Sequence, residues 1–582
     1  MQKSDAPRLE FKGEGASKGI VVGPAYLFRG AYSGEAERAI SSEEVASEVE
    51  RLERALDVAR RELGELAKRT EREAGAEAAA VFEAQLLMVD DPELTGRARA
   101  MIGEKLYDAE GAIRLAGDEA CSLLSQVEDE YLRARVADVR DVVARILSAL
   151  RGGSRVPVAE PREPAVVLAE ELLPSETMLF DRSKVLAFVT ERGSSTSHVA
   201  ILARTLGIPA VVGVVGVLGA VSGGETVALD GGAGLVVVNP GPEELKEWEA
   251  RREAWARRRE ELLSRADLVA ETTDGHRVEL AANIGSPADV GTALEYGAEG
   301  VGLFRTEFLF MERESPPEED EQFEAYRRVA EAMAGRPVIV RTLDVGGDKA
   351  IPWLGRMEEA NPFLGLRGVR LTLDRPELLL VQLRAILRAR VYGDLWVMLP
   401  MITTLGEVRA VRQMLQRAAE ELRTAGKEHA EAPLGIMIEV PSAALLAERL
   451  LEEVDFASVG TNDLTQYTLA VDRTNEKVGP LADALHPAVL RLVAAVAAAG
   501  RKREKWVGVC GDLAGDPLAA PILVGLGVKE LSMAPPLLPE VKEAIRALSM
   551  TRAEEIARRA LSCATAEEVR ELLVGVLAAR FP

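Results

Sequence analysis

The 582-residue chain is poor in cysteine, histidine and aromatic residues. It has three cysteines, four histidines and only 4% Phe, Trp and Tyr together. Cys121, Cys510 and Cys563 are odd in number and far apart. Neither a disulfide framework nor a zinc site with closely spaced ligands can be built from them. We therefore expect a protein of a reducing compartment, the cytoplasm.

Basic residues are fewer than acidic ones. Lys and Arg number 71 against 94 Asp and Glu, which gives a net charge of −23 at pH 7. Binding to nucleic acid or to an anionic membrane surface requires a basic face, because both partners are negatively charged. We therefore expect neither kind of partner.

Long apolar runs are lacking as well. The longest uncharged apolar stretch, residues 208–224, is broken by Pro209 and several glycines. A transmembrane helix needs about 20 consecutive apolar residues, so we expect no membrane insertion. Residues 1–7 have no apolar core, and we expect no signal peptide there.

The composition changes along the chain, and its length predicts about three to four domains. Residues 1–35 and 155–240 contain short β-type runs between Gly and Pro turns, and we predict that together they form one α/β domain. Residues 36–154 interrupt this domain with a sequence rich in Glu, Arg, Ala and Leu, which predicts an inserted helical bundle. In its first helix, apolar residues recur at steps of four and three, which indicates a narrow seam for packing against another helix. The seam consists of Val45, Val49, Leu52, Leu56, Ala59, Leu63 and Leu66.

We predict an exposed linker helix at residues 241–268, because such a helix would carry charged side chains on nearly all of its faces. Residues 269–582 show a repeated strand-then-helix rhythm, which is typical of parallel βα units. The rhythm predicts a TIM (β/α)8 barrel, with an open doubly wound sheet as the alternative. The eight expected strands are residues 278–284, 300–304, 338–343, 395–399, 435–439, 456–460, 507–510 and 530–533.

His198 follows an expected strand (185–189) and a turn of Gly, Ser and Thr residues. An expected short helix, 199–206, comes directly after it. Free backbone N–H groups and the helix dipole favour an anion at such an N-terminus and disfavour imidazolium. The ring would then be a neutral nucleophile that can carry a phosphoryl group. The alternative is a histidine that only caps the helix or lies at a domain surface, which is the commoner role for an isolated histidine.

Several cationic residues follow the expected strands of the second half of the chain. Active sites of TIM barrels lie at the carboxyl ends of the strands, and arginine forks match the oxygens of phosphate and carboxylate groups. We therefore expect a small substrate that carries both groups. The cations are Arg305, Arg341, Lys349, Arg367 and Arg473.

Glu439 and Asp463 lie at the same predicted edge and offer the hard oxygen ligands that Mg²⁺ or Mn²⁺ prefers. The alternative for both is ion pairing with the same arginines. Cys510, beside a glycine at a strand end, is interpreted as an exposed acid–base group. A buried core thiol is the alternative for this residue.

These residues form motifs that resemble those of the phosphoenolpyruvate-utilising phosphotransferases, most closely the enzyme I group of the bacterial sugar phosphotransferase system. The phosphohistidine motif is Gly193-Ser-Ser-Thr-Ser-His198, and the barrel motif is Asp455-Phe-Ala-Ser-Val-Gly-Thr-Asn-Asp-Leu-Thr-Gln-Tyr467. The resemblance covers nearly the whole chain. Supporting segments are Gly302-Leu-Phe-Arg-Thr-Glu-Phe308, Arg341-Thr-Leu-Asp344, Gly508-Val-Cys-Gly511, Phe82-Glu-Ala-Gln-Leu-Leu-Met88 and Glu130-Tyr-Leu-Arg-Ala-Arg-Val-Ala-Asp-Val-Arg140.

The resemblance implies a complete reaction. Phosphoenolpyruvate would bind in the barrel with Mg²⁺ at Glu439 and Asp463, and His198 would take its phosphoryl group. Cys510 would protonate the remaining enolate to give pyruvate. The α/β domain would then swing away and phosphorylate the carrier protein HPr, bound at the helical insertion. The substrate-binding residues implied are Arg305, Arg341, Arg367, Asn462, Asp463 and Arg473.

The resemblance also implies a homodimer formed through the barrel. The chain departs from the family pattern around the histidine. The family often has Gly-Gly and a large residue before Thr-Ser-His, whereas this chain has Gly193-Ser194-Ser195 there and Val199 after the histidine. We expect this change to affect loop flexibility and the rate of transfer to the partner.

Three alternatives remain at this point. A pyruvate phosphate dikinase or phosphoenolpyruvate synthase would need a further ATP-binding domain, for which the assigned segments leave no room. A protein that senses phosphoenolpyruvate without turnover would have lost His198, Glu439, Asp463 or Cys510, and all are present. A nitrogen-type regulatory phosphotransferase is the third alternative. Because no sensory domain precedes residue 1, we expect sugar uptake instead.

Overall fold

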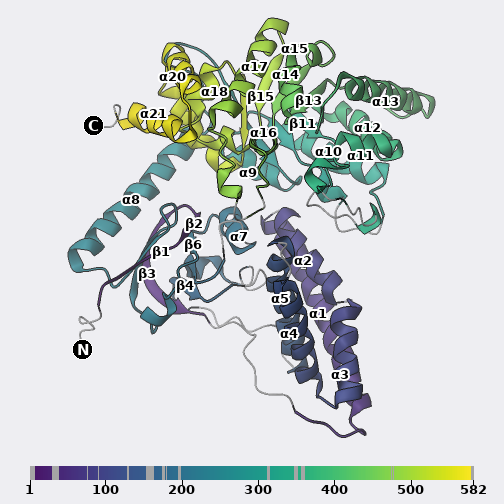
Figure 1. Cartoon of the computed structure of the whole chain (residues 1–582), viewed down its shortest axis with the longest axis vertical. Coiled ribbons are helices and arrows are strands. Elements are labelled where there is room, and N and C mark those ends of the chain that lie inside the picture. The colour runs from purple at the N-terminus through teal and green to yellow at the C-terminus, as the bar shows by residue number, and fades with distance from the viewer. Residues whose placement is uncertain are drawn as a thin grey trace. The chain divides into compact units, whose positions relative to one another are not determined.

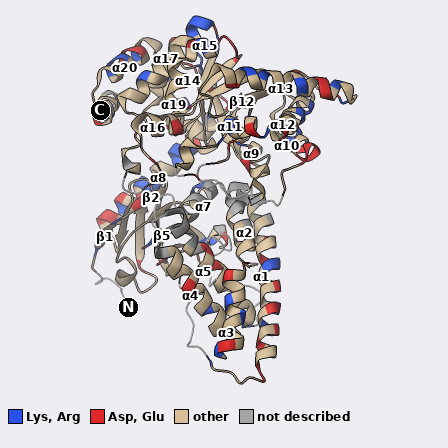
Figure 2. Cartoon of the chain, turned by 45° about the vertical axis from the view of Figure 1, so that its right-hand side comes forward, with Lys and Arg blue, Asp and Glu red and all other residues tan. Residues whose placement is uncertain are grey.

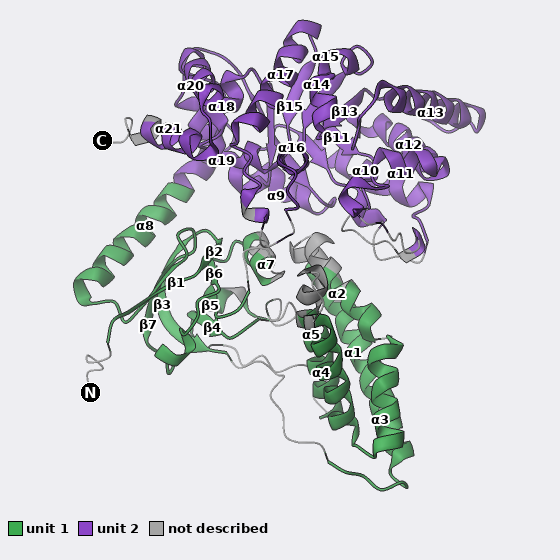
Figure 3. Ribbon diagram, viewed as in Figure 1, with its two compact units in different colours: residues 1–259 green, residues 260–582 purple. Residues whose placement is uncertain are grey.

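The chain forms two compact units, residues 1–259 and residues 260–582 (Figure 3). For some residues inside helices and strands, His198 among them, only the backbone is described. The computed structural model describes residues 7–28, 38–74, 76–89, 91–126, 130–151, 161, 163–172, 177, 180–193, 198–310, 315–346, 352–354, 359, 361–473, 475 and 478–578.

The first unit contains an eight-stranded mixed sheet with the order β1-β8-β7-β3-β4-β5-β6-β2. Neighbours β3 and β4 pair in parallel although the helical insertion separates them in sequence. The sheet is therefore built from both flanks of the insertion. Its inner strands are rich in valine and leucine because both faces are covered. The strands are β1 (Leu9–Lys12), β2 (Glu14–Ser17), β3 (Ile20–Leu27), β4 (Ala165–Ala169), β5 (Val185–Thr190), β6 (Ala210–Val212), β7 (Thr226–Asp230) and β8 (Leu235–Val238).

The insertion is a bundle of five α-helices, with the expected seam on its first helix. Leu52, Leu56, Ala59 and Leu63 of that helix are at most 1% exposed and face the bundle core. The predicted seam is thus confirmed. Charged residues lie along the outer side of these helices (Figure 2). The helices are α1 (Val45–Ala74), α2 (Ala76–Val89), α3 (Arg97–Lys105), α4 (Ala109–Gln126) and α5 (Glu130–Leu150).

Helix α8 (Pro242–Ser264) is largely exposed, as its charge pattern predicts. Trp248 is an exception, since it is 4% exposed and packs on Ala228 and Val237 of the sheet. The guanidinium of Arg251 lies 4.5 Å from the centre of the Trp248 ring. The boundary between the two compact units falls within this helix.

The second unit is a closed barrel of eight parallel strands, so the predicted TIM barrel is confirmed. All eight expected strands are present, with bounds that differ by two residues at most. Their β-branched and aliphatic side chains are buried because helices surround the barrel (Figure 1). The strands are β9 (Glu279–Ile284), β10 (Val301–Phe304), β11 (Val338–Arg341), β12 (Leu395–Leu399), β13 (Leu434–Ile438), β14 (Phe456–Val459), β15 (Trp506–Val509) and β16 (Glu530–Met533).

The apolar periodicity of residues 411–428 predicts an amphipathic helix between the fourth and fifth strands of the barrel. The structure has this helix as α13 (Leu405–Thr424), which begins earlier because Thr404 and Glu407 form a capping box. Within the described part of the chain, no helix combines the length and apolarity that a membrane span requires. The other helices of this unit are α9 (Asp289–Glu295), α10 (Glu319–Met333), α11 (Val369–Asp374), α12 (Pro376–Ala389), α14 (Pro441–Leu445), α15 (Ala447–Leu450), α16 (Thr461–Leu469), α17 (Pro487–Arg503), α18 (Ala520–Gly525), α19 (Leu538–Arg546), α20 (Met550–Ser562) and α21 (Ala566–Ala578).

Candidate functional site

Arg341 is the last residue of β11 and lies at the carboxyl edge of the barrel. Its guanidinium donates to Glu307 and lies 3.2 Å from Oδ2 of Asp344. Burial alone lowers the pKa of this guanidinium, but the carboxylates of Glu307 and Asp344 raise it above its ordinary value. The side chain is therefore a permanent cation in a buried position. Its Nε–H has no acceptor among the described residues.

Arg367 forms a second buried cation beside the first. Its guanidinium lies 3.1 Å from Oδ2 of Asp344 and 3.2 Å from Oδ1 of Asp463. Asp344 consequently bridges two arginines. The Nε–H of Arg367 also lacks an acceptor within the described ranges. Each arginine thus retains one buried donor that an anionic substrate could satisfy.

Glu439 follows β13 directly and is 1% exposed. Its Oε1 accepts a hydrogen bond of 2.6 Å from the backbone N–H of Met401, whose φ of 58° is left-handed. Burial, together with the negative charges of Asp463 and Asp344, raises the pKa of Glu439 to about 8. Carboxylates held this close together favour a bound cation.

The oxygen atoms of Glu439 and Asp463 are of the kind that a divalent metal binds. Among the residues that the structure describes, no group of three or more His, Cys, Asp or Glu is arranged to hold a metal ion. Mg²⁺, however, is usually bound by one or two carboxylates together with substrate phosphates and water. The buried pair Glu439 and Asp463 fits this pattern.

Cys510 is buried, so the prediction that it is exposed is wrong. Its position at a strand end suggested an exposed thiol, yet the residue is 3% exposed. It follows β15 and packs inside the barrel against apolar residues that include Met437 and Phe456. Alternate residues of a barrel strand point inward, and this position is one of them. Burial raises the pKa of the Cys510 thiol to about 12.

Comparisons with known proteins cover both units. Three models of PEP-utilising enzymes match: the N-terminal region at residues 12–135, the mobile domain at 161–234 and the PEP-binding domain at 259–550. A phosphoenolpyruvate-protein phosphotransferase of Staphylococcus carnosus (strain TM300) is 42% identical over 97% of this chain and 98% of its own length. The chain belongs to the phosphoenolpyruvate-protein phosphotransferases.

Two further relatives with the same name agree. That of Listeria monocytogenes serovar 1/2a (strain ATCC BAA-679 / EGD-e) is 43% identical and covers 97% of this chain and 98% of its own. That of Bacillus subtilis (strain 168) is 43% identical over 96% of this chain and 98% of its own length. The predicted family and enzyme class are confirmed.

Arg305 and Arg473 are two more of the predicted arginines in this phosphotransferase. Arg305 follows β10 and is half-buried, whereas Arg473 follows α16 and is exposed. Neither forms an ion pair with the described residues. Lys349 lies outside the described residues. Arg305 and Arg473 therefore remain candidates for substrate contact.

Asn462 is the second residue of α16, beside Asp463. Its Oδ1 accepts a hydrogen bond of 2.9 Å from the backbone N–H of Asp512, which joins the loops after β14 and β15. Gly511 makes this close approach feasible, since a Cβ there would lie 2.1 Å from Oγ1 of Thr461. Asn462 thus helps to hold the loop that carries Cys510.

His198 is the first residue of α7 (His198–Leu206) in the first unit. The expected position at a helix N-terminus is confirmed for the backbone. The imidazole and residues 194–197, including Ser194 and Ser195, lie outside the described part of the structure. Helix α7 itself is anchored, because Ala200 and Ala203 pack on the sheet and Leu202 packs in the core of the helical bundle.

Four residues of the phosphotransferase site received no role from the sequence. Glu307 and Asp344 each lie three residues beyond the end of a strand, which was a usable signal for both. Tyr467, whose hydroxyl lies 3.2 Å from a guanidinium nitrogen of Arg367, was visible only as part of a motif. Met401 gave no signal, because nothing in its sequence context indicates a left-handed backbone beside Glu439.

Proposed function

We propose that this chain transfers the phosphoryl group of phosphoenolpyruvate to His198 and then to a histidine of the carrier protein HPr. The P–O bond to the enol oxygen would break as the P–N bond to His198 forms. The enolate would accept a proton at carbon and leave as pyruvate. The observation that carries this proposal is the buried network of Arg341, Asp344 and Arg367 beside Glu439 and Asp463.

The network suits a small, strongly anionic substrate. Arg341 and Arg367 are already held by carboxylates, so they are oriented before the substrate arrives and lose little freedom on binding. Their unpaired Nε–H groups point to anion binding. Arg305 and Arg473 would add positive charge for the phosphate and carboxylate groups, and Asn462 would help to place them. Positioning and charge neutralisation contribute most of the catalysis in phosphoryl transfer.

Glu439 and Asp463 would hold Mg²⁺, or Mn²⁺ in its place, together with the substrate. The metal would neutralise charge on the phosphoryl oxygens. The raised pKa of Glu439 expresses the repulsion among neighbouring carboxylates, which a cation relieves.

We further propose that residues 1–35 and 155–240 form a mobile phosphohistidine domain, with residues 36–154 as the HPr-docking bundle. Residues 241–268 would be the linker, and residues 269–582 the substrate-binding barrel through which two copies associate. His198 and the arginine network lie in separate compact units, so a moving domain could serve both substrate and carrier. The protein would act in the cytoplasm as the first step of sugar uptake.

Transfer to the carrier is directly measurable. Purified protein, phosphoenolpyruvate and Mg²⁺ should phosphorylate added HPr on histidine without ATP. A nitrogen-type carrier offered in parallel should be a poorer acceptor. If only the nitrogen-type carrier is phosphorylated, sugar uptake is the wrong pathway. If pyruvate is phosphorylated at the expense of ATP, the dikinase alternative holds instead.

Replacing Cys510 with alanine should slow pyruvate formation by ~10²-fold or more, because the enolate loses its proton donor. Since the pKa of this thiol is raised to about 12, the group stays protonated up to roughly pH 10. We therefore expect the wild-type rate of pyruvate formation not to fall through thiol ionisation between about pH 7 and about pH 9. Quenched-flow measurement of pyruvate with Cys563→Ala as control tests this. An unchanged rate in Cys510→Ala would remove the thiol from the reaction.

A further inference from the structure

The amino end of the barrel, at the opposite ends of the strands from the arginine network, contains a cavity of about 30 Å³. A water-sized group needs roughly 10–15 Å³ of such space, so the cavity can hold one small ion or a pair of water molecules. Its wall includes Glu530, Glu279 and Glu299 and the indoles of Trp396 and Trp506. The residues that line it include no Lys, Arg or His.

Glu530, the first residue of β16, is the unusual member of this wall. It is 2% exposed, and neither carboxylate oxygen has a hydrogen-bond donor among the described residues. Two glycines make room for it. A Cβ at Gly302 would lie 1.9 Å from its Oε1, and a Cβ at Gly508 would lie 2.2 Å from its Oε2. The barrel thus accommodates a carboxyl group in its interior, and none of the described residues donates a hydrogen bond to it.

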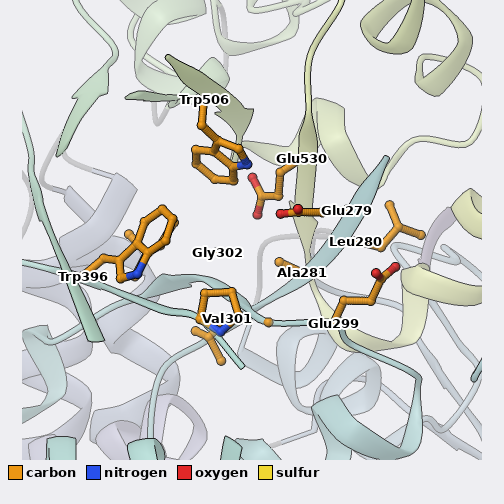
Figure 4. Close-up of a pocket in the computed structure, with 12 residues that line it drawn as sticks. Glu279, Leu280, Ala281, Glu299, Val301, Gly302, Trp396, Trp506 and Glu530 are labelled. Carbon is orange, nitrogen blue, oxygen red and sulfur yellow. The ribbon is translucent and has the colours of Figure 1, made fainter. Parts of the chain in front are cut away.

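The charged residues that share the cavity wall with Glu530 are acidic, although Glu279 also lines a neighbouring pocket with Lys505 and Lys529. Glu279, at the start of β9, lies close enough to act with burial in raising the pKa of Glu530 well above its ordinary value. Figure 4 shows the carboxyl groups of these two residues directed toward one another. Glu299 is ion-paired through Oε2 to Arg277 at 2.6 Å, but its Oε1 is buried without a partner in the described structure. A buried carboxyl group in this setting must either take up a proton or have a cation beside it.

Two indole rings lie beside this carboxyl group. Trp396 and Trp506 are in edge-to-face contact, with ring centres 5.9 Å apart. The ring of Trp506 and the carboxyl group of Glu530 are adjacent. A Cβ placed on Gly508, between them, would lie 3.0 Å from Cη2 of Trp506 and 2.2 Å from Oε2 of Glu530. An indole whose face borders the cavity would attract a cation bound there.

We propose that this cavity binds one small monovalent cation of the size of K⁺ or NH₄⁺, held by Glu530, Glu279 and the indole of Trp506. A volume of about 30 Å³ suits an ion of this size. A divalent metal would require more hard ligands, and the described residues contain no metal-holding group of three carboxylates, histidines or cysteines. The site lies within the barrel and does not depend on the phosphoryl-transfer proposal.

Thallous ion, a K⁺ mimic that quenches tryptophan fluorescence, tests the proposal on the full-length protein. Acetate salts avoid precipitation, and tetramethylammonium acetate keeps the ionic strength constant. We expect saturable quenching that K⁺ or NH₄⁺ reverses and tetramethylammonium does not. The ion that reverses it at the lower concentration identifies the occupant. Two results with the wild-type protein would each overturn the proposal, without any variant. One is quenching that rises linearly with thallous ion concentration, and the other is quenching that K⁺ and NH₄⁺ do not reverse.

The variant Glu530→Gln keeps the shape of the side chain and removes its charge. We expect it to weaken thallous binding by at least about tenfold, whereas the exposed Glu428→Gln should bind as the wild type does. A second readout is the unfolding temperature, which should rise by about 2 °C or more with saturating K⁺ in the wild type and in Glu428→Gln only. Equal binding by Glu530→Gln and the wild type would show that Glu530 is a protonated, hydrated side chain instead.

Discussion

Replacing His198 with alanine will abolish transfer of phosphate from phosphoenolpyruvate to any acceptor, a loss of ~10⁴-fold or more. The side chain is the proposed nucleophile, and its removal takes away the nitrogen that would accept the phosphoryl group. The fold should be unaffected, because Ala200, Leu202 and Ala203 hold α7 in place. Coupled pyruvate release and phosphorylation of HPr are the measurements.

Substrate binding separates the roles of the two units. His198→Ala should bind phosphoenolpyruvate in the presence of Mg²⁺ with a Kd close to that of the wild type, because the arginine network belongs to residues 260–582. Isothermal titration calorimetry measures this directly. If binding disappears while the protein remains folded, the division between nucleophile unit and substrate unit is wrong.

Replacing Arg341 with glutamine should lower kcat/KM by ~10³-fold or more and destabilise the barrel. The substitution removes a cation on which two buried carboxylates, Glu307 and Asp344, depend. Leaving a buried charge without its partner costs about 3–5 kcal/mol. The same loss removes the Nε–H donor proposed for the substrate. Steady-state kinetics and urea denaturation should both report the effect.

A matched control distinguishes the buried network from an ordinary ion pair. Arg328 pairs with Glu324 on an exposed helix surface, where such pairs contribute about 0–1 kcal/mol. Arg328→Gln should therefore leave both kinetics and stability nearly unchanged. Arg341→Lys should recover part of the stability but little activity, since an ammonium group cannot reproduce the guanidinium fork. Full activity in Arg341→Lys would show that only charge matters at this position.

The barrel was predictable because its strands are long enough, and apolar enough, to be recognised from sequence. Strands Leu395–Leu399 and Glu530–Met533 have the predicted bounds. The start of α13 was missed because a capping box, and not the apolar pattern, defines it. The position of His198 at the start of α7 was predictable from the Gly, Ser and Thr residues before it, because these residue types favour a turn.

The arrangement of the site was less predictable, because it depends on contacts between distant segments. Asp344 bridges Arg341, at the end of β11, and Arg367, in the loop before α11. No local pattern shows this bridge. The burial of Cys510 depends on which residues of β15 point into the barrel, and a strand-end position alone left that open. Glu530, an ordinary residue at a strand start by sequence, is exceptional only because Gly302 and Gly508 lie around it.

The central claim is that phosphate from phosphoenolpyruvate becomes bound to one imidazole of this chain. Incubation with radiolabelled phosphoenolpyruvate and Mg²⁺, followed by peptide mapping, tests it most directly. The account predicts one acid-labile, base-stable label per chain, on the peptide that contains His198. Label on any other side chain, or none despite bound substrate, would contradict it.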